Sequence, residues 1–208
     1  MEIKEFRGCR GLVFAEVITD NNETDGGYVV GDVKPLAGSA EISKTVETAS
    51  EARYYDNLAK FVINSEGADT VTFTISVPDD AVLADITGRV YDAEKKAYIE
   101  APRKNKYFAV GYIIGEKGAT TNDERFVWRM KGTFAIPDET SATEDSGTSA
   151  NNMSLVFSGV YTEHKFVNGG GTGVAAPVKA WYIRESDGVA TEEQFFNTVA
   201  TPDSTFGA

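Results

Sequence analysis

The sequence predicts an all-β protein, a sandwich or barrel with one docked short helix and a short C-terminal helix. First, residues 69–77 alternate in polarity, with Val71, Phe73, Ile75 and Val77 on one face and three threonines and Ser76 on the other. Such alternation is typical of a half-buried strand. Second, similar runs recur along the chain between clusters of Gly, Asn, Asp and Pro, which favour turns. Third, only two segments have a helical pattern. We therefore expect about nine to eleven strands.

A long hairpin at 107–137 is expected to organise the rest of the fold. Its first arm, 107–114, is an almost unbroken apolar run, which suits a strand covered on both faces. Its second arm, 125–134, alternates in polarity and is therefore predicted to be half-buried. The intervening segment 115–124 is predicted to be a loop, since it combines Gly, Asn and Asp without a large aliphatic residue. One face of the second arm carries Phe126, Trp128 and Met130, and the other carries Arg125, Val127, Arg129 and Lys131, which we expect to serve also as contact surface.

The chain begins with a strand pair. A strand is expected at 12–18 and a returning strand at 28–34, which Pro35 ends. The acidic tip between them invites a calcium-loop interpretation, but the loop pattern requires Gly where Asp25 stands. A flexible hairpin tip is therefore favoured.

A second group of extended segments follows. Residues 39–48 alternate cleanly and are predicted to form a strand. The pieces 51–55 and 60–65 are shorter extended segments around a turn predicted at Asp56–Asn57, because Asn and Asp tolerate turn geometry. In this interpretation they are separate, short elements.

The strongest helical pattern is at 78–87. Pro78 and two aspartates occupy its first turn, an apolar stripe follows, and Gly88 ends it. A helix of about ten residues must be held by docking rather than by propensity. A hairpin is expected at 90–102, over the turn Ala93–Lys96.

The last part of the chain is predicted to contain two strands and a helix. The strands are expected at 153–166 and at 178–184, which contains Trp181. Thr191 and Gln194 then form a capping box before an apolar side made of Phe195, Phe196 and Val199.

The totals fit one soluble domain over 1–208. The only cysteine is Cys9, so no intramolecular disulfide can form. The start has no apolar core typical of a signal peptide, and no apolar run approaches the ~20 residues of a membrane helix. We therefore expect a soluble protein with no membrane partner. The net charge of −12 argues against nucleic-acid binding by phosphate neutralisation.

No catalytic, cofactor or metal site is predicted. His164 is the only histidine and cannot build a multi-histidine metal site. Cys9 lies between Arg7 and Arg10, whose positive charges would suit a reactive thiolate, but an incidental thiol in a flexible arm is favoured. The glycine-rich run 168–173 lacks the Lys-Ser/Thr of a phosphate loop. Paired carboxylates at the helix starts are explained by the helix dipole. A non-enzymatic protein is expected.

Charge is segregated along the chain. Either these regions are simply solvated, or they form charge-complementary contacts between copies of the protein. The loop at 137–152 is acidic and is expected to be mobile. The candidate contact residues are Lys95, Lys96, Arg103, Lys104 and Lys106 in the basic region and Asp138, Glu139, Glu144 and Asp145 in the acidic loop. The hairpin at 107–137 connects these two regions, so we expect oppositely charged surfaces at its two ends.

Several short segments, taken in order, resemble the major tail proteins, the tail tube subunits of long non-contractile-tailed bacteriophages. No segment is specific alone, whereas their order and spacing cover about 150 residues. The segments are GLVFAEV (11–17), GDVKPLAGSAEI (31–42), ARYYDN (52–57), VPDDAVLADITGRVYD (77–92), YFAVGYIIG (107–115), RFVWRMKGTFAIPDE (125–139) and LVFSG (155–159).

The resemblance implies a tail-tube-type β-sandwich or half-barrel flanked by a helix. Six copies would form a ring, and stacked rings would form a tube that conducts DNA during ejection without binding it. It also implies tape measure, tail initiator and tail terminator proteins as partners, assembly in the host cytoplasm and a final place in the virion tail. Neighbouring rings would be bridged by the N-terminal arm 1–10, the acidic mobile loop 137–152 and the C-terminal segment 192–208, which includes Phe195 and Phe196.

The lumen of such a tube should be neutral or acidic, because a basic lumen would hold DNA phosphates at every ring. We expect the polar strand faces that carry Glu41 and Glu47, or Thr70, Thr72 and Thr74, to line it.

Three other classes remain open. A ring-forming tube of a bacterial secretion system shares the architecture. A carbohydrate-binding β-sandwich module would need exposed aromatic residues on a flat face, whereas Trp128 and Trp181 both lie in strand patterns that suggest burial. A hydrolase on a β-scaffold would need a catalytic constellation, and the sequence singles out none.

Overall fold

A computed structural model describes residues 3–23, 26–139 and 152–207. Strands make up 53% of the chain and helices 8%, so the prediction of an all-β fold with a short helix and a C-terminal helix is confirmed. The strands are β1 (Lys4–Asp20), β2 (Tyr28–Val30), β3 (Lys34–Pro35), β4 (Ser39–Tyr55), β5 (Leu58–Ile75), β6 (Val90–Asp92), β7 (Ala97–Ile99), β8 (Tyr107–Gly118), β9 (Asn122–Phe134), β10 (Met153–Gly159) and β11 (Ala180–Arg184). The helices are α1 (Asp80–Thr87), α2 (Glu192–Phe196) and the short 3-10 turn η1 (Glu185–Asp187).

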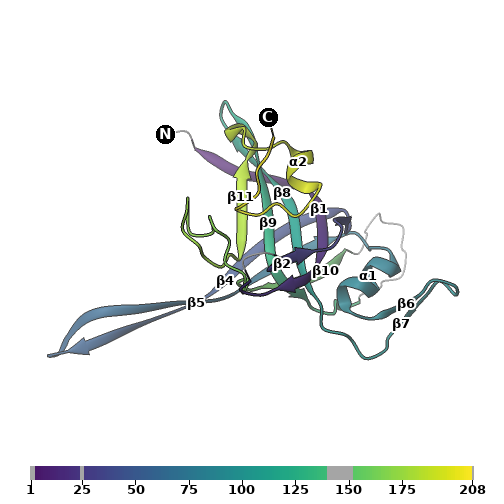
Figure 1. Cartoon of the computed structure of the whole chain (residues 1–208), viewed down its shortest axis with the longest axis horizontal. Helices are drawn as coiled ribbons and strands as arrows, with labels where there is room; N and C mark the ends of the chain where they lie inside the picture. Colours follow the sequence, from purple (N-terminus) through teal and green to yellow (C-terminus); the bar gives the residue numbers. More distant parts are fainter. Residues whose placement is uncertain (1–2, 24–25, 140–151, 208) are drawn as a thin grey trace, which may run out of the picture.

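The main sheet has the order β2-β1-β8-β9-β10-β5-β4 (Figure 1). In addition, β3 pairs with β1, and β11 pairs with β9 alongside β10. β4 lies at one end of this order, yet it also contacts β1, so the sheet curls into an open half-barrel. The small β6–β7 hairpin lies outside this sheet.

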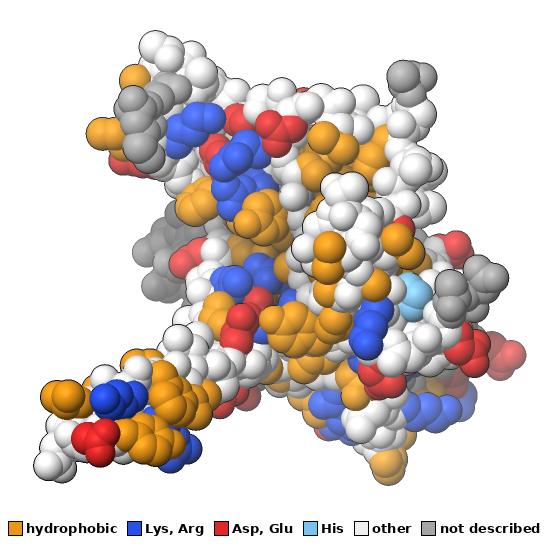
Figure 2. All heavy atoms as spheres, turned by 60° about the vertical axis from the view of Figure 1, so that its left-hand side comes forward, with side chains coloured by type: hydrophobic (Ala, Val, Ile, Leu, Met, Phe, Trp, Pro, Cys, Tyr) orange, Lys and Arg blue, Asp and Glu red, His pale blue; other side chains and the backbone are white. Residues whose placement is uncertain are grey.

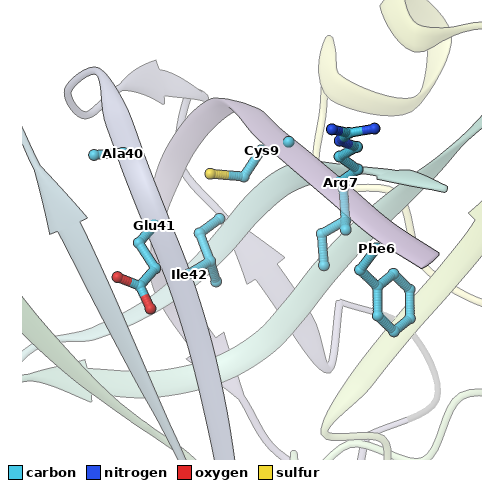
Figure 3. Close-up of a pocket in the computed structure, with 8 residues that line it drawn as sticks. Phe6, Arg7, Cys9, Ala40, Glu41 and Ile42 are labelled. Carbon is cyan, nitrogen blue, oxygen red and sulfur yellow. The ribbon is translucent and has the colours of Figure 1, made fainter. Parts of the chain in front are cut away.

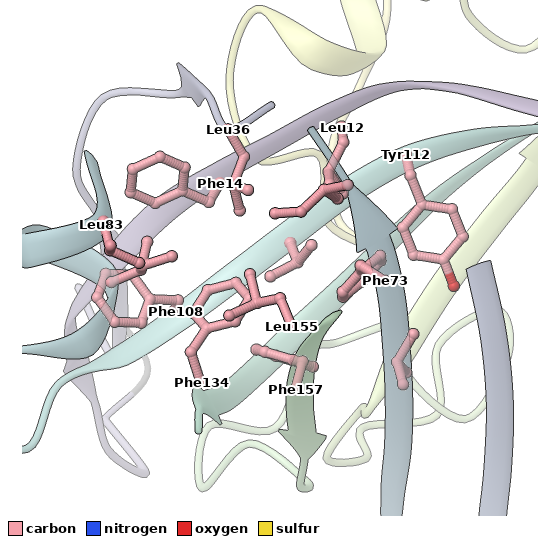
Figure 4. Packing of buried hydrophobic residues seen from close by; sticks show 14 of the residues in the cluster. Leu12, Phe14, Leu36, Phe73, Leu83, Phe108, Tyr112, Phe134, Leu155 and Phe157 are labelled. Carbon is pink, nitrogen blue, oxygen red and sulfur yellow. The ribbon is translucent and has the colours of Figure 1, made fainter. Parts of the chain in front are cut away.

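Two hydrophobic cores lie on opposite faces of β1, β8 and β9. The first fills the half-barrel and is closed at one end by α1 (Figure 4). It includes Phe73, Phe108, Phe134 and Phe157, whose side chains are all at most 1% exposed. The second lies under β11, α2 and the C-terminal segment, and it is centred on Trp128. β1, β8 and β9 therefore each contribute residues to both cores.

The β8–β9 hairpin is buried on both faces. The apolar run of β8 was predicted to be covered on both sides, and this prediction is confirmed by its burial. The prediction of a half-buried second arm is wrong: Val127, Arg129 and Lys131 are at most 7% exposed. Alternating polarity suggested an exposed face, but Arg129 and Lys131 are buried beside acidic partners that neutralise their charges, as described below.

The predicted long loop 115–124 is also wrong. The two strands stay paired as far as Lys117 and Asn122, and Gly115 lies opposite Glu124. Polar residues continue the hairpin because Glu116 forms ion pairs with Arg125 and Arg184 at this end of the sheet. These ion pairs stabilise strand pairing in a segment whose composition is typical of a turn.

The N-terminal segment is a strand rather than an arm. β1 begins at Lys4, which lies opposite Gly118 of β8, and continues through two irregular steps in the register. The prediction of a flexible segment up to residue 10 is therefore wrong from Lys4 onward. Arg10 holds the segment to the body through Glu124 and through Glu192 of α2, at 2.7 Å for the latter pair.

β4 and β5 form one hairpin that extends far beyond the body (Figure 1). The turn predicted at Asp56–Asn57 is confirmed: both residues have positive φ angles, 52° and 63°. Positive φ at both central residues favours Asn, Asp and Gly in two-residue hairpins. The segments 51–55 and 60–65 are not separate elements, because the strands pair continuously from the body to the turn apart from local bulges.

Both predicted helices are present. α1 ends at Gly88 with a φ of 69°, and Leu83 and Ile86 are buried in the first core. The capping box of α2 forms as predicted between Thr191 and Gln194. In the described part of the chain, neither helix has the length and hydrophobicity needed to span a membrane.

Candidate assembly surface

The outer face of the half-barrel carries a grid of small hydroxyl side chains, which we call the hydroxyl face. In β5, Val71, Phe73 and Ile75 point into the core, so the intervening threonines point outward. The register then sets their neighbours: Thr72 lies opposite Val156 of β10 and Ser43 of β4. The face comprises Thr133 of β9; Ser154, Val156 and Ser158 of β10; Thr70, Thr72 and Thr74 of β5; and Glu41, Ser43 and Thr45 of β4.

The hydroxyl face has no lysine or arginine among these described positions. Lys44 belongs to the same strand but lies opposite Val71, on the core side, where its Nζ is 3.2 Å from Asp69. Threonine suits this position because it favours strand geometry while remaining compatible with water. The result is a nearly uncharged surface whose only charged side chain is Glu41.

Four of the five residues predicted to line a lumen share this face: Glu41, Thr70, Thr72 and Thr74. Glu47 follows the same alternation along β4, and its side chain lies beside Gly67 of β5 at the bulge that ends the face. Sequence reasoning missed Thr133, Ser154 and Ser158. Their alternation with Phe134, Leu155 and Phe157 was the available signal, but only pairing between strands places them beside the threonines.

Beyond this face the β4–β5 hairpin continues as a two-stranded ribbon over residues 48–66, which we call the arm. No further strand pairs with it among the described residues, because β10 pairs with β5 only from Asp69 onward. Figure 2 shows hydrophobic side chains gathered along this projection, mixed with charged ones. Its exposed apolar side chains are Tyr54, Tyr55, Leu58, Phe61, Val62 and Ile63, each 47–69% exposed.

The two faces of the arm differ in composition. Cross-strand pairing places Tyr55 with Leu58 and Arg53 with Phe61 on one face, where the rings of Tyr55 and Phe61 stack at 5.9 Å. Tyr54 and Val62 belong to the opposite face. A two-stranded hairpin is at best marginally stable alone in water, and this one exposes apolar groups on both sides. It therefore has the properties of an interaction element.

A buried ion network anchors the base of the arm. The carboxylate of Asp69 accepts hydrogen bonds from Arg129 at 2.8 Å and from Lys179 at 3.2 Å, and it also pairs with Lys44. Burial by itself raises the pKa of Asp69, but the hydrogen bonds from Lys179 and Lys44 and the nearby positive charges outweigh it and hold the pKa below its ordinary value. The network ties β5 and β4 to β9 at the point where the arm leaves the body.

Lys131 is neutralised in the same way. Its Nζ is 2.6 Å from Asp20 and also lies near Glu163. Burial lowers the pKa of Lys131, but the hydrogen bond and the charge of Asp20 outweigh this effect, and the pKa lies above its ordinary value. The expectation that Arg129 and Lys131 form a contact surface for other copies is therefore wrong, because both side chains are buried and form ion pairs within their own subunit.

The predicted basic region is only partly available. Lys95, Lys96, Arg103 and Lys104 are exposed. Lys106 instead bridges Asp85 at 2.6 Å and Glu16 at 3.0 Å. Burial lowers the pKa of Lys106, but these two carboxylates outweigh it and raise the pKa above its ordinary value.

The basic region and the start of the acidic loop lie at the same end of the β8–β9 hairpin. We expected them at opposite ends, but antiparallel pairing brings the beginning of β8 next to the end of β9. Arg103 accordingly donates a hydrogen bond to the carbonyl of Phe134 at 3.2 Å. Of the acidic candidates, Asp138 and Glu139 are exposed, while Glu144 and Asp145 lie outside the described residues.

The C-terminal segment packs on its own subunit. Phe195 is fully buried, its carbonyl accepts a hydrogen bond from Trp128 Nε1 at 2.9 Å, and Phe196 packs against the same tryptophan. Phe206 stacks on Trp181, which is half-buried. Because Phe195 is fully buried within its own subunit, its burial does not support the prediction that it contacts a neighbouring copy.

Within the described ranges, no group of three or more His, Cys, Asp or Glu side chains could hold a metal ion. His164 is partly buried with its ring edge against Phe166, at 4.9 Å between centroids. Comparison of the chain with models of protein families and with curated proteins finds no match.

Proposed function

We propose that this protein is a structural subunit of a bacteriophage tail tube, which self-assembles into stacked hexameric rings that conduct DNA. The observation that carries the proposal is the hydroxyl face, a curved sheet surface without a cation, adjoining an arm that exposes apolar side chains. The first feature suits a channel wall and the second suits contact between subunits.

The hydroxyl face is compatible with DNA that must move. Each Lys or Arg that neutralises a phosphate adds to non-specific DNA affinity, and a tube repeats every contact at each ring. Hydroxyl groups can exchange hydrogen bonds with water and phosphate without adding charge. The net charge of −12 acts in the same direction.

The same face does not favour the carbohydrate-binding alternative. Flat sugar-binding surfaces use exposed aromatic rings. Its described positions include no aromatic side chain. The exposed aromatic residues lie elsewhere: Tyr54, Tyr55 and Phe61 on the arm, and Phe6, Tyr107, Tyr161 and Tyr182 on other parts of the body.

Electron microscopy of the purified protein at high concentration tests the proposal. We expect rings or hollow tubes, formed spontaneously or after addition of the tail initiator proteins. A protein that stays monomeric under both conditions would overturn it.

The channel assignment has its own test. In the variant Thr70→Lys with Ser154→Lys, two exposed positions of the hydroxyl face, both outside the lining of the groove described below, become cationic. We expect tubes of normal shape that retain DNA, and virions that eject it more slowly, with a salt dependence steeper by about one unit per added phosphate contact. The matched control is Thr70→Ser with Ser154→Thr. If the lysine variant ejects DNA at the normal rate, the hydroxyl face does not line the channel.

A further inference from the structure

The arm ends in an apolar tip, and the body of the same chain contains a groove that can receive one. We propose that the tip of the arm, Tyr54–Leu58, inserts into the groove between β1 and β4 of a second copy of this chain. The inference rests on the proposed self-assembly and names the contact that drives it.

The tip is unusually apolar for an exposed turn. Tyr54 is 69% exposed, Tyr55 55% and Leu58 62%. Aromatic side chains bury roughly 150–250 Å² each when covered, so these residues supply a large part of a hot spot. A standard interface uses about 20–30 residues on each side, and the whole arm is close to that size. The arm is thus large enough to form most of one partner's contribution.

The groove is the gap at which the half-barrel fails to close. Its walls are residues 6–9 of β1 and 40–42 of β4, Ile114 lies between them, and its volume is about 300 Å³. Figure 3 shows Cys9 and Ile42 within the gap, with the charged ends of Arg7 and Glu41 on its two sides. A cavity of this size accommodates one large side chain or a short extended segment.

Both walls of the groove are strand edges. Among the described residues, β4 pairs only with β5, and β1 pairs with β3 and β2 only from Val13 onward. The backbone groups of residues 6–9 and 40–42 therefore have no strand partner on the groove side. Such edges accept an added strand through main-chain hydrogen bonds. The arm is itself a β-ribbon whose strands reach its tip, so it can supply that strand.

The charges of the tip and the groove are complementary. The tip carries Asp56, which is 90% exposed at its side chain, and Lys60, whose Nζ lies 4.0 Å from the Asp56 carboxylate in a loose, exposed pair that can exchange partners. The groove carries Arg7 and Glu41, neither of which has an ion-pair partner within the described part of the chain. Asp56 with Arg7 and Lys60 with Glu41 would give two opposite-charge contacts across the interface, which favours the correct partner and orientation.

The tip cannot reach the groove of its own subunit. β4 runs without interruption from the groove wall at 40–42 to the tip at Tyr55, and it is paired with β5 along this length. At about 3.3 Å per residue, the tip is held roughly 40 Å from its own groove. The contact must therefore join different copies head to tail, and contacts of this kind produce rings or open fibres.

Cys9 makes the contact testable, because the only thiol of the chain lines the groove. In the variant Tyr55→Cys, a tip thiol would meet Cys9 of the next copy. Mild oxidation should then produce a ladder of covalent dimers, trimers and larger species, since each copy offers one tip and one groove. Disulfides form only when the two Cα atoms are about 4.4–6.8 Å apart, so the ladder reports close contact.

Two controls distinguish the alternatives. In Tyr55→Cys with Cys9→Ser, the ladder should disappear. In Val189→Cys, an exposed position away from the arm and the groove, native Cys9 should yield at most a background of dimers. Covalent dimers that persist without Cys9 would show that arms pair with arms, and they would overturn the proposal. So would the absence of any ladder from Tyr55→Cys.

Charge exchange provides a second measurement that does not depend on oxidation. Asp56→Arg and Arg7→Asp should each weaken assembly by about tenfold, and the double variant should restore it. Equal defects in the single and double variants would contradict the proposed pair.

The outcome separates this inference from the proposed function. A covalent ladder without rings or tubes in the electron microscope would support the docking contact and overturn the tail-tube assignment. Tubes whose subunits show no Tyr55→Cys ladder would support the assignment and overturn the docking contact.

Discussion

The protein contains two long antiparallel hairpins with opposite environments. The β8–β9 hairpin is covered on both faces, and Phe126 and Trp128 are completely buried in it. The β4–β5 hairpin is covered only where it belongs to the half-barrel, and its arm leaves Phe61 and both neighbouring tyrosines, Tyr54 and Tyr55, exposed. Both hairpins are rich in aromatic residues, so composition does not account for the difference.

The difference teaches where stability and interaction reside in this molecule. β8–β9 has a core on each side, so its aromatic residues contribute to folding. Among the described residues, no further strand pairs with the arm, and the contact of Glu66 with Lys179 lies at its base. The exposed aromatic residues of the arm therefore contribute little until another molecule covers them. The following changes test this division, from the largest expected effect to the smallest.

Removing one phenylalanine from each hairpin is the most direct test. Phe126→Ala should lower the free energy of unfolding by about 3–5 kcal/mol, because a fully buried ring leaves a cavity between Phe195 and Phe196. Phe61→Ala should change it by only about 0.5 kcal/mol, as is usual for an exposed side chain. Denaturant unfolding followed by circular dichroism, below the concentration of assembly, measures both. Equal losses would contradict the division between core hairpin and arm.

Asp69→Asn should be the next largest change. It removes the charge that neutralises Arg129 and Lys179, whose side chains are 8% and 7% exposed. Loss of one partner from a buried ion pair costs roughly 3 kcal/mol or more. Glu66→Gln is the matched control, since Glu66 pairs with the same lysine but is half-exposed, and its loss should cost at most about 1 kcal/mol. A mild effect of Asp69→Asn would show that the arm base does not depend on this network.

Acid should weaken the same network. The pKa of Asp69 lies lower in the folded protein than in the unfolded chain, so the ionised carboxylate favours folding. That contribution is complete above the unfolded value of about 3.9 and is lost as the pH falls through the lower folded pKa. Unfolding measured between pH 5 and pH 2 should therefore show a steeper loss of stability for the natural protein than for Asp69→Asn. Parallel curves would assign the acid sensitivity to other carboxylates.

The smallest expected effect concerns the arm turn. Asn57 has a φ of 63°, which glycine adopts without strain, and Asp-Gly is a preferred pair for this turn. Glycine relieves the strain of the positive φ but makes the unfolded chain more flexible, so the two effects largely offset each other. The net change in the free energy of unfolding for Asn57→Gly should therefore be at most a few tenths of a kcal/mol. Asn57→Ala should instead loosen it. Hydrogen exchange of the arm amides distinguishes the variants, with β8–β9 amides as the internal reference.

Much of the fold follows from local patterns in the sequence. The alternation of Val71, Phe73 and Ile75 with threonines predicted both the strand and its buried face, but the assignment of Val77 to that face is wrong, because the strand ends at Ile75 and Val77 is 69% exposed. The capping box at Thr191 and Gln194 and the stop at Gly88 located the two helices. The Asp56–Asn57 pair located the turn of the arm. In each case the determining interactions lie within a few residues.

The errors share one physical cause. Arg129 and Lys131 looked like surface residues because cations are rarely buried without partners, and their partners Asp69 and Asp20 are distant in the sequence. The polar run around Glu116 looked like a loop for the same reason, since Arg125 and Arg184 stabilise it from neighbouring strands. Long-range pairing converted polar residues into interior ones.

The sequence by itself determined the all-β class, the helix ends and the polar outer face of β5, because backbone geometry and side-chain alternation are local properties. Only the tertiary structure decided that β8–β9 lies between two cores and that residues 48–66 stand free as an arm. Those environments depend on which strands lie beside each hairpin. A strand covered on both faces and one exposed on both faces can have similar apolar content, and only their neighbours distinguish them.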